Sequence, residues 1–539
     1  MRLQILITGR EVVVQEVFQK PDQILHMLPY FISEEDRNKQ SGEIYIDDRE
    51  MLNTDQRDIW WQKYALATNQ VYGALPGILK RSNLIEITAQ PLLNYLVALS
   101  FVQGQLTLSE ETSLNTIYAD LLNAVYERGY ENNRRHIAIG DMSKKQFVRI
   151  LEEIALSAWH DGDGRITTVR EIEEHCENNG LRRLLAVFEE GAKAGITRLL
   201  AAFYFRQSGI RSDEKTFEFT HKSFGEYLTA CRIVRAMERI QKQLDRRKDD
   251  MEEGWDERKA LLYWANVCGP TRMDVYLLNF LRAEVALKDK SWVARWQITF
   301  SHLIGVMLRQ GMPMERVEPA LKFQAMNQWA INSEEALLAA LSCCALVTKD
   351  ISKIDWPTTE ACGAWLNRMQ GQRTGEENVV VSMSLGYLDL SYSTLFFCDL
   401  YRANLNGVNL SEASLDQAFF YHANLSGASL EGASLYRARL DEANLDGASL
   451  VRTRFTQASF DRASLEGANL SGASLEGANL REANLREANL EGANLKGANL
   501  DNTQWSPSTS WANISGLDGA RNVPEELKEE TFRSTEAVE

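Results

Sequence analysis

The sequence ANLEGANLKGANL, residues 488–500, repeats a five-residue unit in which every fifth residue is Leu. The same period continues without a slip from Leu385 to Trp505, with Leu at every fifth position apart from three Phe and the final Trp. An α-helix, with 3.6 residues per turn, would spread these side chains around its axis. A strand would send alternate ones to opposite faces. The chain is therefore predicted to turn once per repeat, so that all of them lie in one core.

The other positions of the unit also have characteristic residue types. A small residue, usually Ala, stands two residues before each Leu, as at Ala403, and Asn or Ser usually stands directly before it. Gly often stands two residues after the Leu, as at Gly447. We expect Ala and Leu to fill the interior, the polar residues to face water, and Gly to occupy a tight backbone corner.

This segment resembles the pentapeptide-repeat family, whose pattern is Ala-(Asp/Asn)-Leu-x-x. The resemblance implies a right-handed, four-sided β-helix with four repeats per coil, and hence about six coils stacked about 4.8 Å apart over roughly 29 Å. Asn404, Asn424 and Asn444 recur once per coil and are expected to form a ladder on one face. Solenoids need capped ends, and Trp505 and Trp511 are predicted to cover the last Leu layer.

Residues 1–380 have mainly helical patterns. The apolar run Leu3–Ile7 predicts a strand buried on both faces. Residues 91–101 and 113–130 have helical periodicity, and residues 216–219 alternate like a short strand. The segment Ser223-Phe-Gly-Glu226 fits a capping box that would begin a helix. One buried face of that helix is predicted to contain Phe224, Tyr227, Leu228 and Cys231.

Three segments resemble NACHT-type signalling ATPases of the STAND group in their order and spacing. They read LQILITGRE (3–11), AQPLLNYLVAL (89–99) and FEFTHKSFGEYLTA (217–230). The resemblance implies that Arg10 senses a γ-phosphate, that Pro91 packs near adenine and that His221 contacts the β-phosphate of ADP. It also implies a winged-helix-like regulatory region. The alternatives are an ordinary strand-end Arg, a first-turn helix Pro and a junction His.

The phosphate-binding motif of that family, G-x-x-x-x-G-K-[ST], does not occur in the sequence. Residues 73–82 lack its spacing, and the acidic segment 44–48 follows Arg10, where the order of the family would not place a Mg²⁺ site. Phosphoryl transfer then has no stabilised transition state, so we expect no enzyme activity and no cofactor. ATP or ADP would bind only if a further N-terminal half supplied the phosphate loop. The strand at Leu3–Ile7 is expected to favour association if it lacks neighbouring strands.

Composition restricts the partners further. A formal net charge of −16 argues against a general nucleic-acid binder. No apolar run approaches the roughly 20 residues of a membrane span, and the first residues do not fit a signal peptide. The seven Cys form no CxxC pair, which favours reduced thiols in a cytoplasm, and the seven His show no metal-ligand spacing. We therefore expect a cytoplasmic protein with no metal, nucleic-acid or membrane partner.

The fold class predicted from these patterns is an α+β multidomain protein, in which a mainly helical region with a winged-helix-like part precedes a right-handed, four-sided β-helix. Five parts are expected. They are a remnant of a NACHT-type core and lid (1–100), a helical and winged-helix-like region (101–235), a helical linker domain (236–380), the β-helix (381–510), and a C-terminal cap and tail (511–539).

Outward aromatic residues in the first two coils suggest a binding surface for a protein partner. The candidates are Tyr392, Phe396, Phe397, Tyr401, Phe419 and Tyr421. The leading hypothesis is a regulatory or sensor protein of the NACHT type that binds a protein through this surface, in bacterial defence or stress signalling. The sequence favours a different use of these aromatics, in which they dock against the preceding helical domain.

Two other functions stay open. Quinolone-resistance pentapeptide-repeat proteins bind DNA gyrase as acidic DNA mimics, and residues 385–505 carry 15 acidic against 9 basic side chains. A continuous acidic face would support mimicry, whereas a mixed one would not. The remaining hypothesis is a passive scaffold or gene fragment without independent activity.

Overall fold

The structure, a computed structural model, describes a large part of the chain and divides it into two compact units, Met1–Arg232 and Ile233–Glu539. The described residues are 30–31, 54–69, 74–81, 84–89, 94–95, 97–98, 101, 113–127, 129–130, 134–135, 143–161, 166–178, 205–211, 214–219, 222–371, 379–524 and 527.

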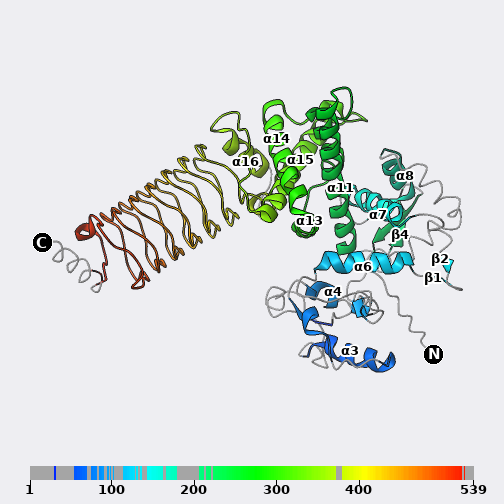
Figure 1. Cartoon of the computed structure of the whole chain (residues 1–539), viewed down its shortest axis with the longest axis horizontal. Coiled ribbons are helices and arrows are strands. Elements are labelled where there is room, and N and C mark those ends of the chain that lie inside the picture. The colour runs from blue at the N-terminus through cyan, green and yellow to red at the C-terminus, as the bar shows by residue number, and fades with distance from the viewer. Residues whose placement is uncertain are drawn as a thin grey trace, which may run out of the picture. The chain divides into compact units, whose positions relative to one another are not determined.

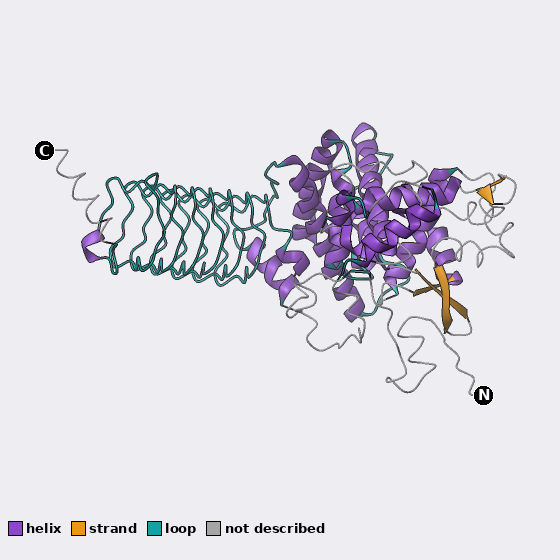
Figure 2. Ribbon diagram, turned by 90° about the horizontal axis from the view of Figure 1, so that it is seen from below, coloured by secondary structure: helices purple, strands orange, loops and turns teal. Residues whose placement is uncertain are grey.

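The described part of the first unit is mainly helical and contains two small antiparallel sheets (Figure 2). Its elements are α3 (Gln56–Ala67), η3 (Gly77–Lys80), α4 (Ile85–Ala89), α6 (Leu114–Glu127), β1 (Gly129–Tyr130), β2 (Arg134–Arg135), α7 (Lys144–His160), β3 (Ile166–Thr168), α8 (Val169–Asn178), β4 (Phe205–Arg211), β5 (Glu214–Phe219) and the start of α11 (Lys222–Asp249).

The larger sheet has the order β3-β5-β4, with both pairs antiparallel. Ile166 pairs with Glu218, and Phe205 pairs with Phe219. The predicted strand at 216–219 is therefore confirmed, as the central strand of this sheet. Helix α7 packs against β3, and α8 contacts β5. Phe219 is buried, and its ring meets the ring of Phe224, at the start of α11, at 6.1 Å.

The prediction for the start of α11 is wrong in one respect. The helix is already formed at Lys222, so Ser223 lies inside it and is not its cap. The Ser223 hydroxyl is buried and hydrogen-bonds to the Tyr118 hydroxyl at 2.7 Å, while Glu226 pairs with Lys222 at 2.9 Å. A partner from a distant helix has replaced the local capping pattern. The predicted apolar face is confirmed for Phe224, Tyr227 and Leu228, which are buried, whereas Cys231 is only partly so.

A buried ion pair joins α7 to α11. The guanidinium of Arg232 donates from Nε to Oε1 of Glu153 at 2.6 Å, and both side chains are at least 96% buried. Burial raises the pKa of the Glu153 carboxyl, and Arg232 opposes that shift. Burial, reinforced by the charge of Arg232, lowers the pKa of nearby His175 on α8 to about 4, while Glu171 acts in the opposite direction. The three helices thus meet around one buried cation.

His175 should make the first unit less stable in acid. Its pKa in the folded state lies near 4, below the ordinary value of 6.5, so between these values the unfolded chain gains a proton that the folded chain does not. Stability should therefore fall as the pH drops through this window, by at most about 3 kcal/mol from this group. The test is the pH dependence of amide exchange in α8 for the wild type and His175→Gln. Identical slopes for the two proteins would contradict the assignment.

The second unit begins with the rest of α11 and a bundle of helices. These are α12 (Glu257–Cys268), α13 (Val275–Ala286), α14 (Lys290–Gln310), η5 (Met314–Arg316), α15 (Phe323–Thr348), α16 (Ala361–Gln370) and α17 (Val379–Ser382). Helix α15 is long and apolar enough to cross a membrane, but 83% of its apolar window is buried, so it is the core helix of the bundle. Its buried Glu334 accepts a hydrogen bond from Trp365 Nε1 at 2.9 Å and pairs with Arg368, which ties α16 to α15.

The repeats form stacked coils after α17, drawn from yellow to red in Figure 1. From Asp389 to Asn484, parallel bridges join each residue that precedes a repeat centre to the residue 20 positions later, as in Asn404 to Asn424 to Asn444. Twenty residues, or four repeats, therefore make one coil, as predicted. From Leu385 to Leu500 every repeat centre is at most 2% exposed, which confirms the predicted Leu core.

The corner of each repeat lies two residues after the centre, and its conformation explains the Gly found there. All 24 such positions from Tyr387 to Asn502 have positive φ, nine of them Gly. The amide of the next residue closes the turn, as in Ala403 N to Leu400 O at 3.0 Å. A positive φ at the third residue is the mark of a type II turn. The prediction of a tight corner is confirmed, although most corners are not Gly.

Gly447 allows this corner to be tested. Its φ is +63°, and an added Cβ would meet no atom within 4 Å, so only the backbone conformation opposes a side chain. We expect Gly447→Ala to destabilise the β-helix by about 1 kcal/mol. The readout is the free energy of unfolding from chemical denaturation. Glu491→Ala, one position earlier in its own corner, is the control and should change stability by less than about 0.5 kcal/mol. Equal effects would contradict the argument.

The last coil departs from the five-residue register. Asn484 still pairs with Gln504, but Asn489 pairs with Ser510 and Asn499 with Arg521, so one and then two extra residues enter the coil. Trp511 is 8% exposed and meets the partly exposed Trp505 edge to face at 6.4 Å. This end also contains the short helix η7 (Leu517–Gly519). The two Trp close this end together, with Trp511 as the more buried partner.

Candidate interaction surface

The six predicted aromatic residues remain in contact with solvent. We call them the aromatic face, and their exposed fractions run from 37% at Tyr421 to 68% at Tyr392. Phe396 and Tyr401 stand one residue after a repeat centre, Phe397 stands two after, and Phe419 stands one before. Because these positions point away from the Leu core, the five-residue register alone directs the side chains outward. With the exception of Tyr392, they border a single side of the first two coils.

The helical bundle contacts backbone groups of the first coil of the β-helix, including the carbonyl of Asp399 between Phe397 and Tyr401. Ser352 pairs with Leu388 in parallel, and Trp356 donates from Nε1 to the carbonyl of Asp389 at 2.9 Å. Gln370 donates to the carbonyl of Asp399 at 3.1 Å. In the described part of the chain the six side chains of the aromatic face keep 37% to 68% of their surface exposed, so docking against the bundle stays a prediction for them. Tyr387, a further outward aromatic residue of the first coil, does contact the bundle, since its ring lies 5.4 Å from Nζ of Lys349.

Stacking of successive coils orders the aromatic face. Tyr401 and Tyr421 are one coil apart, and their rings stack with a centroid distance of 6.2 Å and an interplanar angle of 12°. His422 packs edge to face on Tyr421 at 4.3 Å, and the guanidinium of Arg402 lies 5.2 Å from the centre of the Tyr401 ring. Neighbouring coils therefore hold the rings in place before any partner binds. The sequence analysis missed Arg402 and His422, although both recur at the same corner as Tyr401.

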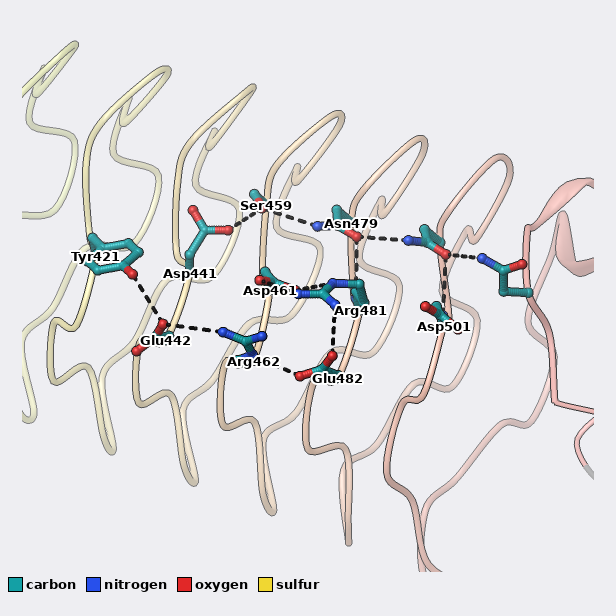
Figure 3. Close-up of polar contacts among 12 residues, drawn as sticks. Tyr421, Asp441, Glu442, Ser459, Asp461, Arg462, Asn479, Arg481, Glu482 and Asp501 are labelled. Carbon is teal, nitrogen blue, oxygen red and sulfur yellow. Dashed lines mark hydrogen bonds and ion pairs between the residues drawn. The ribbon is translucent and has the colours of Figure 1, made fainter.

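A ladder of charged residues continues along the same corner into the later coils (Figure 3). Glu442 accepts a hydrogen bond from the Tyr421 hydroxyl at 3.1 Å and also lies 4.0 Å from Arg462. Arg462 pairs with Glu482 at 2.8 Å. Arg481 pairs with Glu482 and with Asp461, each at 2.8 Å. The hydrogen bond to Glu442 raises the pKa of Tyr421, so its phenol stays neutral as a donor.

The Asn ladder is confirmed in register but not in its bonding. The amide oxygens of Asn424 and Asn444 accept hydrogen bonds from the backbone amides two residues later, at 3.1 and 2.9 Å, and so cap their own turns. On another face, Asn499 donates to Asn479 at 3.0 Å and Asn522 donates to Asn499 at 2.8 Å (Figure 3). Coil stacking therefore brings the side chains together, and local turn geometry decides which atoms bond.

The nucleotide-site candidates Arg10, Pro91 and His221 lie outside the described residues. Within the described ranges, no group of His, Cys, Asp or Glu is arranged to hold a metal ion. The described Cys are all free thiols, most of them buried, and burial raises the pKa of Cys343 to about 12. The aromatic face is therefore the candidate site that the structure allows us to describe.

A four-sided coil with an apolar core and an ordered outer face defines a solenoid protein that presents a surface. Residues 393–432, 438–477 and 468–504 match the family described as pentapeptide repeats, in eight copies. The β-helix of this chain thus belongs to the pentapeptide-repeat family.

Solved structures of this family align with part of the chain. HetL of the cyanobacterium Nostoc, involved in heterocyst differentiation regulation, is 28% identical with a TM-score of 0.20, and the match covers 25% of this chain and 82% of HetL. A protein of the Arabidopsis thaliana thylakoid lumen is 31% identical with a TM-score of 0.16, over 20% of this chain and 72% of its own. QnrB1, a plasmid-mediated fluoroquinolone resistance protein, is 19% identical with a TM-score of 0.13, and the match covers 22% of this chain and 80% of QnrB1. No curated protein matches the chain.

Proposed function

We propose that this chain is a regulatory or sensor protein whose β-helix binds a protein partner through the aromatic face. The observation that carries the proposal is the exposure of six large aromatic side chains, five of them on one side of two adjacent coils. Exposed aromatic clusters of this kind mark contact surfaces, and Tyr and Phe supply large contact areas there. The rings are already ordered by stacking, which lowers the entropic cost of binding. The role is one of binding rather than catalysis.

We further propose that the first unit is the regulatory part of a NACHT-type signalling protein. The support is the order of its elements, in which α7, β3 and α8 precede the β4–β5 hairpin and β3 pairs with β5. This order suits a winged-helix-like region, and helix α11 follows β5 as the segment 217–230 requires. Nucleotide binding by Arg10, Pro91 and His221 depends on a phosphate loop from a further segment. A cytoplasmic location follows from the same proposal.

Mimicry of DNA is a second hypothesis, because carboxylates gather on the side of the β-helix away from the five aromatic residues that share one side; Tyr392 lies among these carboxylates. Seven of them form no ion pair within the described part of the chain, namely Asp389, Glu412, Glu431, Asp446, Glu466, Glu487 and Glu491. Arg452 and Arg486 interrupt this side, so it is not a continuous acidic face. Inhibition of gyrase supercoiling by the purified chain would favour mimicry, and its absence would leave the aromatic face as the better account.

The proposed binding surface predicts a large effect for Phe396→Ser combined with Tyr401→Ser. Ser occupies the same repeat position at Ser411 and Ser471, so the coil should retain its fold. Loss of two central aromatic contacts should weaken partner binding by about 2 kcal/mol or more. Proteins cross-linked to the chain in its native cell would be quantified for the wild type and the variant.

The matched control is Glu431→Ser with Glu491→Ser, at the same repeat position on the other side of the rod. A protein that is lost with the aromatic variant and retained with the control would support the surface. Equal recovery of every protein with all three chains would contradict it and would favour the passive scaffold.

A further inference from the structure

We infer that the segment recognised by the aromatic face combines apolar side chains with carboxylates. This inference rests on the function proposed above and specifies the chemistry of the partner. It follows from which charged side chains around the aromatic rings already have partners within the β-helix and which do not. The relevant side of the rod contains the corners that begin at Phe396 and Tyr401, together with the residues above them in later coils.

Two cations on this side, Arg402 and Arg437, have no carboxylate of the described residues within ion-pair distance. Arg402 lies over the ring of Tyr401 at 5.2 Å, and Arg437 lies over Tyr436 at 4.9 Å. The Nε of Arg437 donates to the neutral side chain of Gln457 at 2.7 Å. Both guanidiniums therefore keep their charge uncompensated next to aromatic rings. A planar guanidinium held in this way can bind a carboxylate through two hydrogen bonds.

The carboxylates on the same side are occupied by donors from the rod itself. Asp399 accepts a hydrogen bond from the amide of Tyr401 at 3.0 Å. Asp416 accepts from the Ser434 hydroxyl at 2.6 Å and from the amide of Tyr436 at 3.0 Å. These bonds hold Asp399 in its own turn and tie Asp416 to the next coil.

The next coils repeat this arrangement with ion pairs. Glu442 lies 3.3 Å from Nδ1 of His422 and also accepts from Tyr421, while Asp441 lies 3.6 Å from Arg439. Farther along, Arg462 and Arg481 are held by Glu482 and Asp461. Among the described cations on this side, the two without a paired carboxylate are therefore Arg402, in the first coil, and Arg437, in the coil that follows the exposed rings. The apolar side chains of a partner that combines apolar and acidic residues would pack against the exposed rings, and its carboxylates would pair with the guanidiniums.

The repeat itself supplies a variant that should keep the fold. Arg402 and Arg437 occupy the corner position with φ of 54° and 55°, and Glu occupies the equivalent position at Glu412 and Glu442 with φ of 58° and 56°. Arg402→Glu with Arg437→Glu therefore reverses the charge without a new backbone strain. The control is Arg452→Glu, which changes the same corner position on another side of the rod.

The probe is a random peptide library displayed on phage and selected on the full-length protein. Peptides that also bind the Phe396→Ser, Tyr401→Ser variant are removed. We expect the enriched peptides to contain Leu, Ile or aromatic residues together with Asp or Glu. They should bind the double Arg variant at least about tenfold more weakly than the wild type. Binding to Arg452→Glu should be unchanged.

Each other outcome is decisive. Enriched peptides that are apolar but basic or uncharged, with unchanged binding to the double Arg variant, would overturn the inference while leaving the aromatic face as a binding surface. No enrichment after the subtraction would overturn both. A wild-type dimer that becomes a monomer in the aromatic variant, measured by sedimentation, would show that a second copy covers the face, and this too would overturn the inference.

Discussion

Phe455→Ala should lower the free energy of unfolding of the β-helix by about 3 to 5 kcal/mol. The Phe455 ring is completely buried and packs edge to face on Phe460 at 4.9 Å. The coils before and after place Leu435 and Leu475 at the same position, so the space cannot collapse without moving both neighbours. The loss should include the transfer free energy of the ring and the cost of the cavity. It is measured by chemical denaturation with native-state amide exchange of the adjacent coils.

Phe455→Leu is the matched control, because Leu is the usual residue at a repeat centre. It should cost no more than about 1.5 kcal/mol. The prediction fails if the Ala and Leu variants are equally stable, since that would mean that the interior of the rod can refill a lost ring. It also fails if the protection lost in Phe455→Ala is confined to α15, which is outside the β-helix.

Arg232→Met should destabilise the first unit by about 3 to 5 kcal/mol. The change leaves the Glu153 carboxylate buried without its cation, and burial already raises the pKa of that carboxyl. The expected result is a loss of amide protection in α7 and at the start of α11. Hydrogen exchange measures this protection. The loss of stability in Arg232→Met should be smaller in acid, because Glu153 then takes up a proton and is no longer a buried charge.

The double variant Glu153→Met, Arg232→Met separates charge from packing. Replacing a whole buried ion pair by apolar side chains is often neutral or stabilising, so the double variant should recover most of the loss. A double variant as unstable as Arg232→Met alone would show that the Arg232 side chain matters through its shape and its other contacts. A single variant as stable as the wild type would show that the pair contributes nothing.

The β-helix could be predicted almost completely from the sequence, because its long-range contacts recur at a constant separation. Asn404 meets Asn424 for the same reason that Asn444 meets Ser464, namely that four turns of five residues return the chain to the same place. One local rule, repeated, determines the register, the core and the corners. The rule stops where extra residues enter before Ser510, and there the sequence could indicate only that the register had slipped.

The start of α11 shows where local patterns are insufficient. Ser223 and Glu226 have the spacing of a capping box, yet their partners are Tyr118 and Lys222. Tyr118 is 105 residues away in the sequence, so no local pattern could indicate it. The partners of the buried Glu334 on α15 were similarly hidden, since Trp365 and Arg368 lie on α16, 31 and 34 residues farther along the chain. Folding of distant segments onto each other decided both cases.

For the candidate site too, the sequence determines one part and the tertiary structure decides the other. The sequence by itself determined that six aromatic side chains point outward, because their positions in the five-residue unit exclude them from the core. Only the tertiary structure decided that the helical bundle contacts backbone groups of the first coil while these rings keep part of their surface exposed. It also decided which charges are compensated, since an ion pair such as Arg462 with Glu482 depends on side-chain rotamers across two coils. The five-residue period determines whether a side chain points inward or outward. Its ion pairs and its exposure to solvent depend on which other segments of the folded chain lie beside it.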